Sequence, residues 1–70
     1  MKYKIQMVNP LGLWGDMKTS EEDGPYKVEL FAFKWEAKDE IEDMCEGLGD
    51  DPSDYRIVRE DKIQDVDYYN

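Results

Sequence analysis

The chain has one cysteine and no histidine in 70 residues, and this constrains its fold more than any other feature. A chain of this length buries only about 60% of its unfolded surface, so small domains often need a disulfide, a metal or a partner subunit. Cys45 has no second cysteine to pair with, and a structural zinc site lacks its usual ligands. We therefore expect one domain, residues 1–70, held together by a single apolar core.

The same features indicate where such a chain resides. A lone thiol is typical of a reducing compartment. The sequence has no apolar run long enough to span a bilayer and no pattern of a secretory signal at its start. We therefore expect a cytoplasmic protein that has no membrane contact.

The whole net charge of −9 lies in the second half of the chain. Residues 1–35 carry five acids and five bases, whereas residues 36–70 carry thirteen acids and four bases. Direct binding to nucleic acid needs clustered Lys and Arg, so this balance argues against it. An acidic surface favours a basic partner instead, and proteins that bind nucleic acid are a plentiful source of basic surfaces.

Three segments have strand patterns. Residues 2–8 alternate, with the apolar Tyr3, Ile5 and Met7 on one side and Lys2, Lys4 and Gln6 on the other, which predicts a half-buried strand. Residues 26–35 (YKVELFAFKW) give the strongest strand signal and are apolar on both faces. Residues 55–60 form the third strand. Residues 10–25 read as a long connection, and residues 63–69 as either a fourth short strand or an ordered tail.

Residues 36–48 have the pattern of an amphipathic helix. Its apolar positions follow one another at helical spacing, and Gly47 and Gly49 offer positions at which it can end. The apolar stripe consists of Ala37, Ile41, Met44, Cys45 and Leu48. The order of elements predicts an α+β fold of the ββαβ type, with a small antiparallel sheet of three to four strands and one helix packed on one face. In this fold the first strand lies at the centre, between the second and the third.

The outer face of this helix is the main candidate for a binding site. At about 100° per residue its carboxylates lie opposite the apolar stripe, and like charges four residues apart each cost the helix roughly 0.2–0.5 kcal/mol. Two interpretations are open: a solvated face, or a row of carboxylates spaced like phosphates that fits a basic groove. The residues are Glu36, Asp39, Glu42, Asp43 and Glu46.

Two neighbouring features have similar alternatives. The loop with Asp50 and Asp51 is rich in oxygen ligands, but Pro52 interrupts it where a calcium loop needs alternating ligands, so we expect a turn without a metal. Its two acids, Asp50 and Asp51, extend the candidate surface.

Trp14 is either an anchor for a partner or part of a lid that shields Phe31 and Phe33. Cys45 is interpreted as a core residue, because its acidic neighbours disfavour a thiolate.

Catalysis has little support in the sequence. Without His the acid–base groups are Asp, Glu, Lys and Tyr, and 70 residues hardly enclose the cleft that a pair of catalytic carboxylates requires. We expect no enzyme activity and no cofactor.

The segment from residue 26 to residue 59 resembles a group of known proteins. It reads as a strand, an acid-rich helix opened by Glu36-Ala37-Lys38-Asp39-Glu40, and the strand Tyr55-Arg-Ile-Val-Arg59. In size, pattern and charge this resembles the small acidic proteins with which phages inhibit host machinery, such as anti-CRISPR proteins, DNA mimics and inhibitors of host polymerase. The resemblance covers about half the chain and matches no family motif residue by residue.

The resemblance implies inhibition by stoichiometric binding, in the cytoplasm of a host bacterium if the protein is phage-encoded. The expected partner is the basic surface of a nucleic-acid-binding protein. The alternative is a small structural module that forms a homodimer through Phe31, Phe33 and Trp35, with the acidic half providing only solubility.

Overall fold

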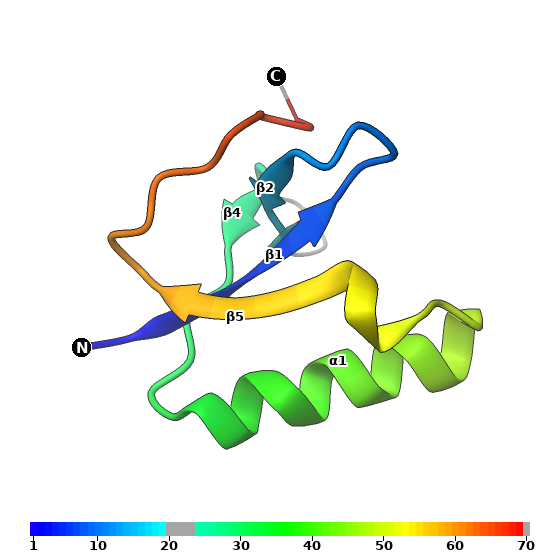
Figure 1. Ribbon diagram of the computed structural model, residues 1–70. Coiled ribbons are helices and arrows are strands. Elements are labelled where there is room, and N and C mark those ends of the chain that lie inside the picture. The colour runs from blue at the N-terminus through cyan, green and yellow to red at the C-terminus, as the bar shows by residue number, and fades with distance from the viewer. Residues whose placement is uncertain (20–23, 70) are drawn as a thin grey trace.

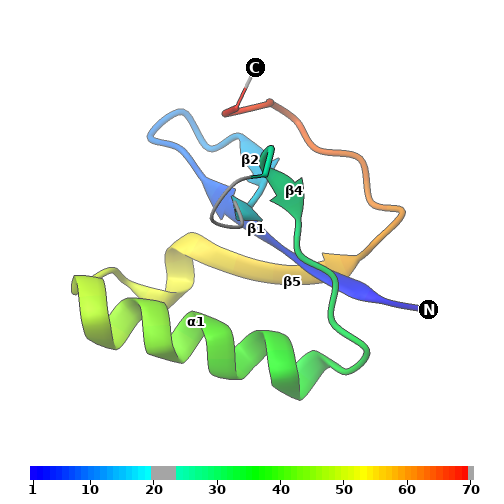
Figure 2. The ribbon, with the colours of Figure 1, turned by 180° about the vertical axis from the view of Figure 1, so that it is seen from behind.

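The computed structural model describes residues 1–19 and 24–69, and it confirms the predicted α+β class. One helix lies below a small sheet, and the C-terminal segment crosses above that sheet in both views (Figures 1 and 2). The elements are β1 (Tyr3–Val8), β2 (Trp14–Asp16), β3 (Lys18–Thr19), β4 (Lys27–Val28), α1 (Lys34–Leu48), the 3-10 helix η1 (Pro52–Asp54) and β5 (Tyr55–Arg59).

The main sheet has the antiparallel order β2-β1-β5, so β1 is the central strand, as predicted, but its neighbour on one side is Trp14–Asp16 instead of the predicted strand over residues 26–35. The strand after the helix pairs with β1, as predicted, and the structure places Ile5 opposite Ile57. β3 and β4 form a separate two-stranded sheet.

The predicted long connection over residues 10–25 is wrong for its described part, because the chain turns back at once. The side-chain oxygen of Asn9 accepts hydrogen bonds from the backbone N–H groups of Leu11 (2.9 Å) and Leu13 (3.0 Å). Gly12 has a positive φ of 82°, which a glycine adopts without steric penalty. This compact turn returns the chain along β1 as β2 and then leads into β3. Residues 20–23 of the predicted connection lie outside the described residues.

The predicted strand over residues 26–35 is also largely wrong. Only Lys27–Val28 is a strand, and Phe31 makes a single antiparallel bridge to Tyr3. The helix begins at Lys34, two residues before the predicted start. The physical reason is local capping: the Glu36 carboxylate accepts a hydrogen bond of 3.1 Å from the backbone N–H of Phe33. Phe33 and Trp35, which favour strands by type, therefore become the N-cap and the second residue of the helix.

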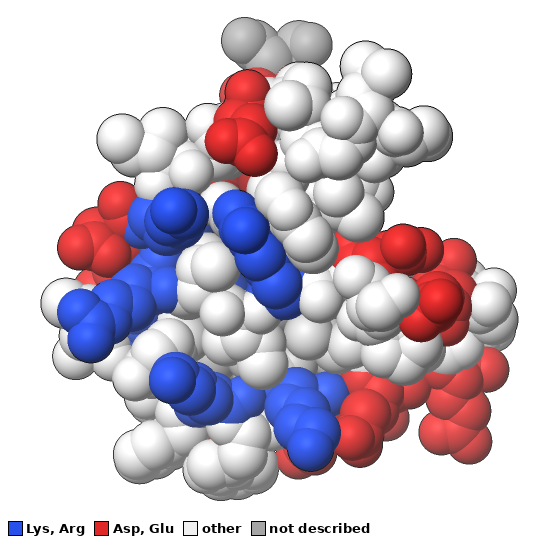
Figure 3. Space-filling view, viewed as in Figure 1, with Lys and Arg blue, Asp and Glu red and all other residues white. Residues whose placement is uncertain are grey.

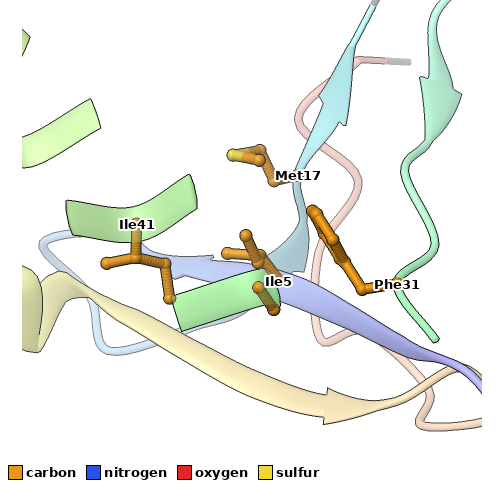
Figure 4. Packing of buried hydrophobic residues seen from close by; sticks show 5 residues of the cluster. Ile5, Met17, Phe31 and Ile41 are labelled. Atoms are coloured by element: carbon orange, nitrogen blue, oxygen red, sulfur yellow. The ribbon is translucent and has the colours of Figure 1, made fainter. Parts of the chain in front are cut away.

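The core lies between α1 and the sheet (Figure 4). Ile5, Met17 and Phe31 come from the sheet side and meet Ala37 and Ile41 of the helix. Met44 and Cys45 are partly buried against this cluster. Leu48, predicted to belong to the apolar stripe, is 74% exposed. It is the last helical residue, and Gly49 then ends the helix with a φ of 74°.

The other face of the sheet is polar and nevertheless buried, which the alternating pattern of residues 2–8 does not predict. Lys4 is 5% exposed and Gln6 is 0% exposed. The Lys4 ammonium lies 2.9 Å from the carboxylate of buried Asp16, and the Gln6 amide donates to the same carboxylate at 2.9 Å. The Gln6 carbonyl oxygen accepts two bonds from the Arg56 guanidinium, at 2.9 and 2.7 Å. These four side chains form a continuous polar network across three strands.

The C-terminal segment covers this network as an ordered tail without strand structure, which was one of the two alternatives for residues 63–69. The Lys62 carbonyl accepts a hydrogen bond of 2.6 Å from Lys4 Nζ, and the Gln64 side chain accepts one of 3.0 Å from the Asp16 N–H. The Tyr68 hydroxyl donates to the carbonyls of Met7 and Leu13. The polar side of β1 is thus buried because the tail supplies partners for it.

Gly15 makes the fit of this tail testable. A Cβ atom there would lie 2.6 Å from the Val66 carbonyl oxygen and 2.6 Å from the Tyr68 ring, so the tail backbone would have to move. We expect Gly15→Ala to lower the free energy of unfolding by about 1–3 kcal/mol, as overpacking does. The matched control is Gly47→Ala in α1, where nothing lies within 4 Å of the new Cβ. That change should raise stability by about 0.5–1 kcal/mol, because alanine favours the helix. Urea unfolding measures both, and equal stabilisation by the two changes would show that the tail does not pack on Gly15.

Candidate binding surface

The outer face of α1 exposes the carboxylates predicted from the sequence. Asp39, Glu42, Asp43 and Glu46 are all exposed, and Glu36 is half-buried because it caps the helix start. In the view of Figure 3, acidic residues gather on the right, over the C-terminal part of α1 and the loop after it. The structure therefore brings these five predicted residues together on one surface.

Within residues 1–19 and 24–69, no Lys or Arg forms an ion pair with the carboxylates of this face. Among the described residues, ion pairs join Lys4 to Asp16 at 2.9 Å and Lys18 to Asp67 at 3.6 Å, and neither involves α1. The pairs Asp39 with Asp43 and Glu42 with Glu46 stand four residues apart and repel each other. Glu46 also lies near the negative end of the helix dipole, where the last turn has no base. The arrangement lowers helix stability and leaves the charge available to a partner.

Trp35 is a member of this surface that the sequence interpretation placed on a strand. It precedes Asp39 by four residues and Glu42 by seven, so all three share one side of the helix. Trp35 is 63% exposed and stacks on Phe33, with the ring centroids 6.3 Å apart and an angle of 14° between the planes. Continuing the helical periodicity one turn upstream would have found it. We call Trp35, Glu36, Asp39, Glu42, Asp43 and Glu46 the acidic helix surface.

The loop after α1 uses its carboxylates locally. Asp51 Oδ1 accepts a hydrogen bond of 3.0 Å from the Ser53 N–H, which caps η1 and lowers the pKa of Asp51. Asp50 accepts a hydrogen bond of 2.8 Å from the Tyr55 hydroxyl. In the part of the chain that the structure describes, no group of three or more His, Cys, Asp or Glu side chains is placed to hold a metal ion. Asp50 and Asp51 are exposed and continue the charge of the acidic helix surface.

Cys45 lies on the inner side of α1, partly buried against the core. Its desolvation, followed by the nearby carboxylates of Asp50, Asp51 and Asp54, raises the pKa of the thiol. A thiol held in its neutral form is a poor nucleophile. This agrees with its interpretation as a core residue.

Trp14 is not brought to the acidic helix surface. It lies on β2 two residues before Asp16, so it shares the face of Asp16 and Gln6, while α1 packs on the opposite face of the sheet. The Arg56 guanidinium stacks on the Trp14 ring at 4.3 Å. The lid alternative is wrong for Phe33, which is 58% exposed, whereas Phe31 is buried within the helix-side core. Trp14 therefore borders the buried polar network.

Comparisons with known proteins give no relative. No family model, curated protein or solved structure matches the chain. Of the helices that the structure describes, none has the length and apolar character needed to span a membrane.

Tyr55 offers a spectroscopic test of the loop at the end of α1. Burial, followed by the hydrogen bond to Asp50 and the charge of that carboxylate, raises the pKa of Tyr55 from 10.0 to about 12. Because the folded pKa is the higher one, the neutral hydroxyl stabilises the fold fully below pH 10, and this contribution is lost as the pH rises towards 12. We expect the difference in phenolate absorbance between wild type and Tyr55→Phe to titrate near pH 12, with the other four of the five tyrosines cancelling. A difference curve centred at pH 10 would contradict the hydrogen bond to Asp50.

Proposed function

We propose that the protein is a non-enzymatic binding protein whose acidic helix surface occupies a basic, nucleic-acid-binding surface of a partner protein and blocks it. The observation that carries the proposal is the row of exposed carboxylates of Asp39, Glu42, Asp43 and Glu46, which form no ion pair among the described residues, with the exposed Trp35 at the N-terminal end of α1. Such a row imitates the charge of a nucleic-acid strand without any chemistry being performed.

The spacing of the surface supports this proposal. Carboxylates three and four residues apart on a helix lie about 5–6 Å from each other, and from Trp35 to Glu46 the surface extends about 16 Å along the axis. Opposite charges steer association, and an exposed aromatic residue provides the apolar contact that a stable interface needs. The phage inhibitors that the sequence resembles would use such a surface in the same way.

The test reverses the charge of the acidic helix surface. Glu42→Lys/Glu46→Lys removes like-charge pairs and places bases near the C-terminal end of the helix, so stability should hold or rise. The control Glu60→Lys/Asp61→Lys changes two exposed acids outside α1 and alters the net charge equally. Partners are captured from bacterial lysate on immobilised wild type, eluted by a salt gradient and identified by mass spectrometry. They are then titrated with all three proteins at low and high salt.

We expect the reversal on α1 to abolish capture of a basic partner and the control to retain it. Binding of wild type should weaken as salt rises, since attraction between exposed charges is screened beyond about 8–10 Å at ordinary ionic strength. The partner should lose its nucleic acid when wild type is added. Equal affinities of wild type and the α1 variant, without salt dependence, would disprove the electrostatic mechanism.

A second candidate function is a structural module that self-associates, and the exposed aromatic residues before and at the helix start favour it. Leu30, Phe33 and Trp35 are 43%, 58% and 63% exposed, and apolar side chains gathered in this way often contact another chain. If this function holds, sedimentation should show a dimer for wild type and a monomer for Phe33→Ser/Trp35→Ser, at low and high salt alike. A wild-type monomer at high concentration would exclude it.

A further inference from the structure

A second charged surface, of opposite sign, lies along the outer edge of β5. An open groove of about 730 Å³ runs between the start of α1, β5 and the first residues of the tail. Its lining includes four bases, Lys34, Arg56, Arg59 and Lys62, and one acid, Asp61. Figure 3 views this side of the molecule, and Lys and Arg side chains gather over its centre and left, around β5. We call this the basic edge groove.

The four bases of the groove form no ion pair within the described residues. Neither ion pair among the described residues includes Lys34, Arg59 or Lys62. Lys34 lies over the Tyr3 ring at 5.5 Å, and Arg56 is held by Gln6 and Trp14. A protein of net charge −9 thus concentrates four of its nine bases around one strand.

The groove also exposes unused backbone groups. β5 is an edge strand, and the hydrogen bond from the Glu60 N–H to the Lys2 carbonyl fixes which of its residues face β1. Hydrogen bonding alternates along an antiparallel pair, so the N–H and C=O of Ile57 and the N–H of Arg59 point away from β1. Within the described residues these groups have no hydrogen-bond partner. They form a short template on which another strand can pair.

The bases flank this template on both faces of the sheet. Arg59 shares the helix side with its partner Tyr3 and with Lys34, whereas Arg56 shares the tail side with Gln6. Lys62 belongs to the tail that covers this second side. Because successive side chains of a strand point to opposite faces, an added strand with consecutive acids would meet bases on each.

We propose that the basic edge groove binds an extended acidic peptide segment of a partner protein, which pairs with β5 as an added strand. This goes beyond the proposed function, because it concerns a different surface and a partner of opposite charge. The free backbone groups of Ile57 and Arg59 match the alternating donors and acceptors of a peptide backbone, which a nucleic acid lacks. The acidic helix elsewhere on the chain also repels a long polyanion more than a short acidic segment.

The test uses the intact protein and a labelled peptide, acetyl-Thr-Thr-Glu-Glu-Glu-Glu-Thr-Thr-amide, followed by fluorescence anisotropy. A second peptide carries N-methyl groups on all four glutamates, which keeps its charge and removes the backbone N–H donors with which its acidic residues could pair with β5. On the protein side, Arg59→Glu is compared with Lys27→Glu. Both replaced side chains are exposed, both changes alter the net charge equally, and Lys27 lies on β4 outside the groove.

We expect the unmethylated peptide to bind wild type and Lys27→Glu with equal affinity, and to bind Arg59→Glu at least about tenfold more weakly. The methylated peptide should not bind any of the three proteins. Equal binding of both peptides would overturn strand addition. Tighter binding of a single-stranded oligonucleotide would make the groove a nucleic-acid site and overturn the proposal. Self-association of wild type that Arg59→Glu abolishes would assign the groove to a second copy of the chain. Absence of peptide binding at millimolar concentration would overturn the proposal, and the bases would then serve only to prevent unwanted strand pairing at an exposed edge. None of these results depends on the acidic helix surface.

Discussion

The ion pair between Lys4 and Asp16 is the interaction on which the rest of the structure depends. It lies on the sheet face opposite α1, which normally faces solvent when one helix covers the other side of an antiparallel sheet, and which is buried here. Removing one partner of a buried pair typically costs about 3–5 kcal/mol, because the remaining charge is left without compensation. Gln6 extends the pair to Arg56, and the tail completes it through the Lys62 carbonyl and the Gln64 side chain. Hydrogen bonding, more than apolar contact, therefore joins β2, β1, β5 and the tail and fixes their relative positions.

Much of the fold follows from local sequence patterns, and the failures have two different causes. The alternation of residues 2–8, the apolar spacing of Ala37 and Ile41, and the β-branched residues of 55–60 correctly predict β1, α1 and β5. The same alternation fails to predict that Lys4 and Gln6 are buried, because their partners lie 10 to 58 residues away and no pattern within the strand contains them. The aromatic residues at 31, 33 and 35 likewise suggest a strand, but one hydrogen bond from Phe33 to Glu36 turns this segment into a helix start.

The candidate surfaces could be predicted only in part, for a related reason. Helical periodicity is local, so the exposed acids of α1 could be read directly from the sequence, whereas Trp35 was missed because the helix start was misplaced. The basic edge groove combines Lys34 with Arg59 and Lys62, and only the pairing of β5 with β1 brings these distant residues around one edge. The net negative charge of residues 36–70 hides the fact that basic and acidic side chains gather on different surfaces, since Arg56, Arg59 and Lys62 belong to this acidic half of the sequence.

The position of the tail also determines when the protein can fold during synthesis. The hydrogen bond from Lys4 to the Lys62 carbonyl spans 58 residues, and the bond from Tyr68 to the Met7 carbonyl spans 61. β1 therefore leaves the ribosome together with β2 and Asp16 but well before the tail residues that cover its polar side and before Arg56, which completes the network. Chains dominated by such distant contacts fold late and slowly. The polar side of β1 consequently stays uncovered by the tail, and accessible to chaperones, until residues 62–68 have been released.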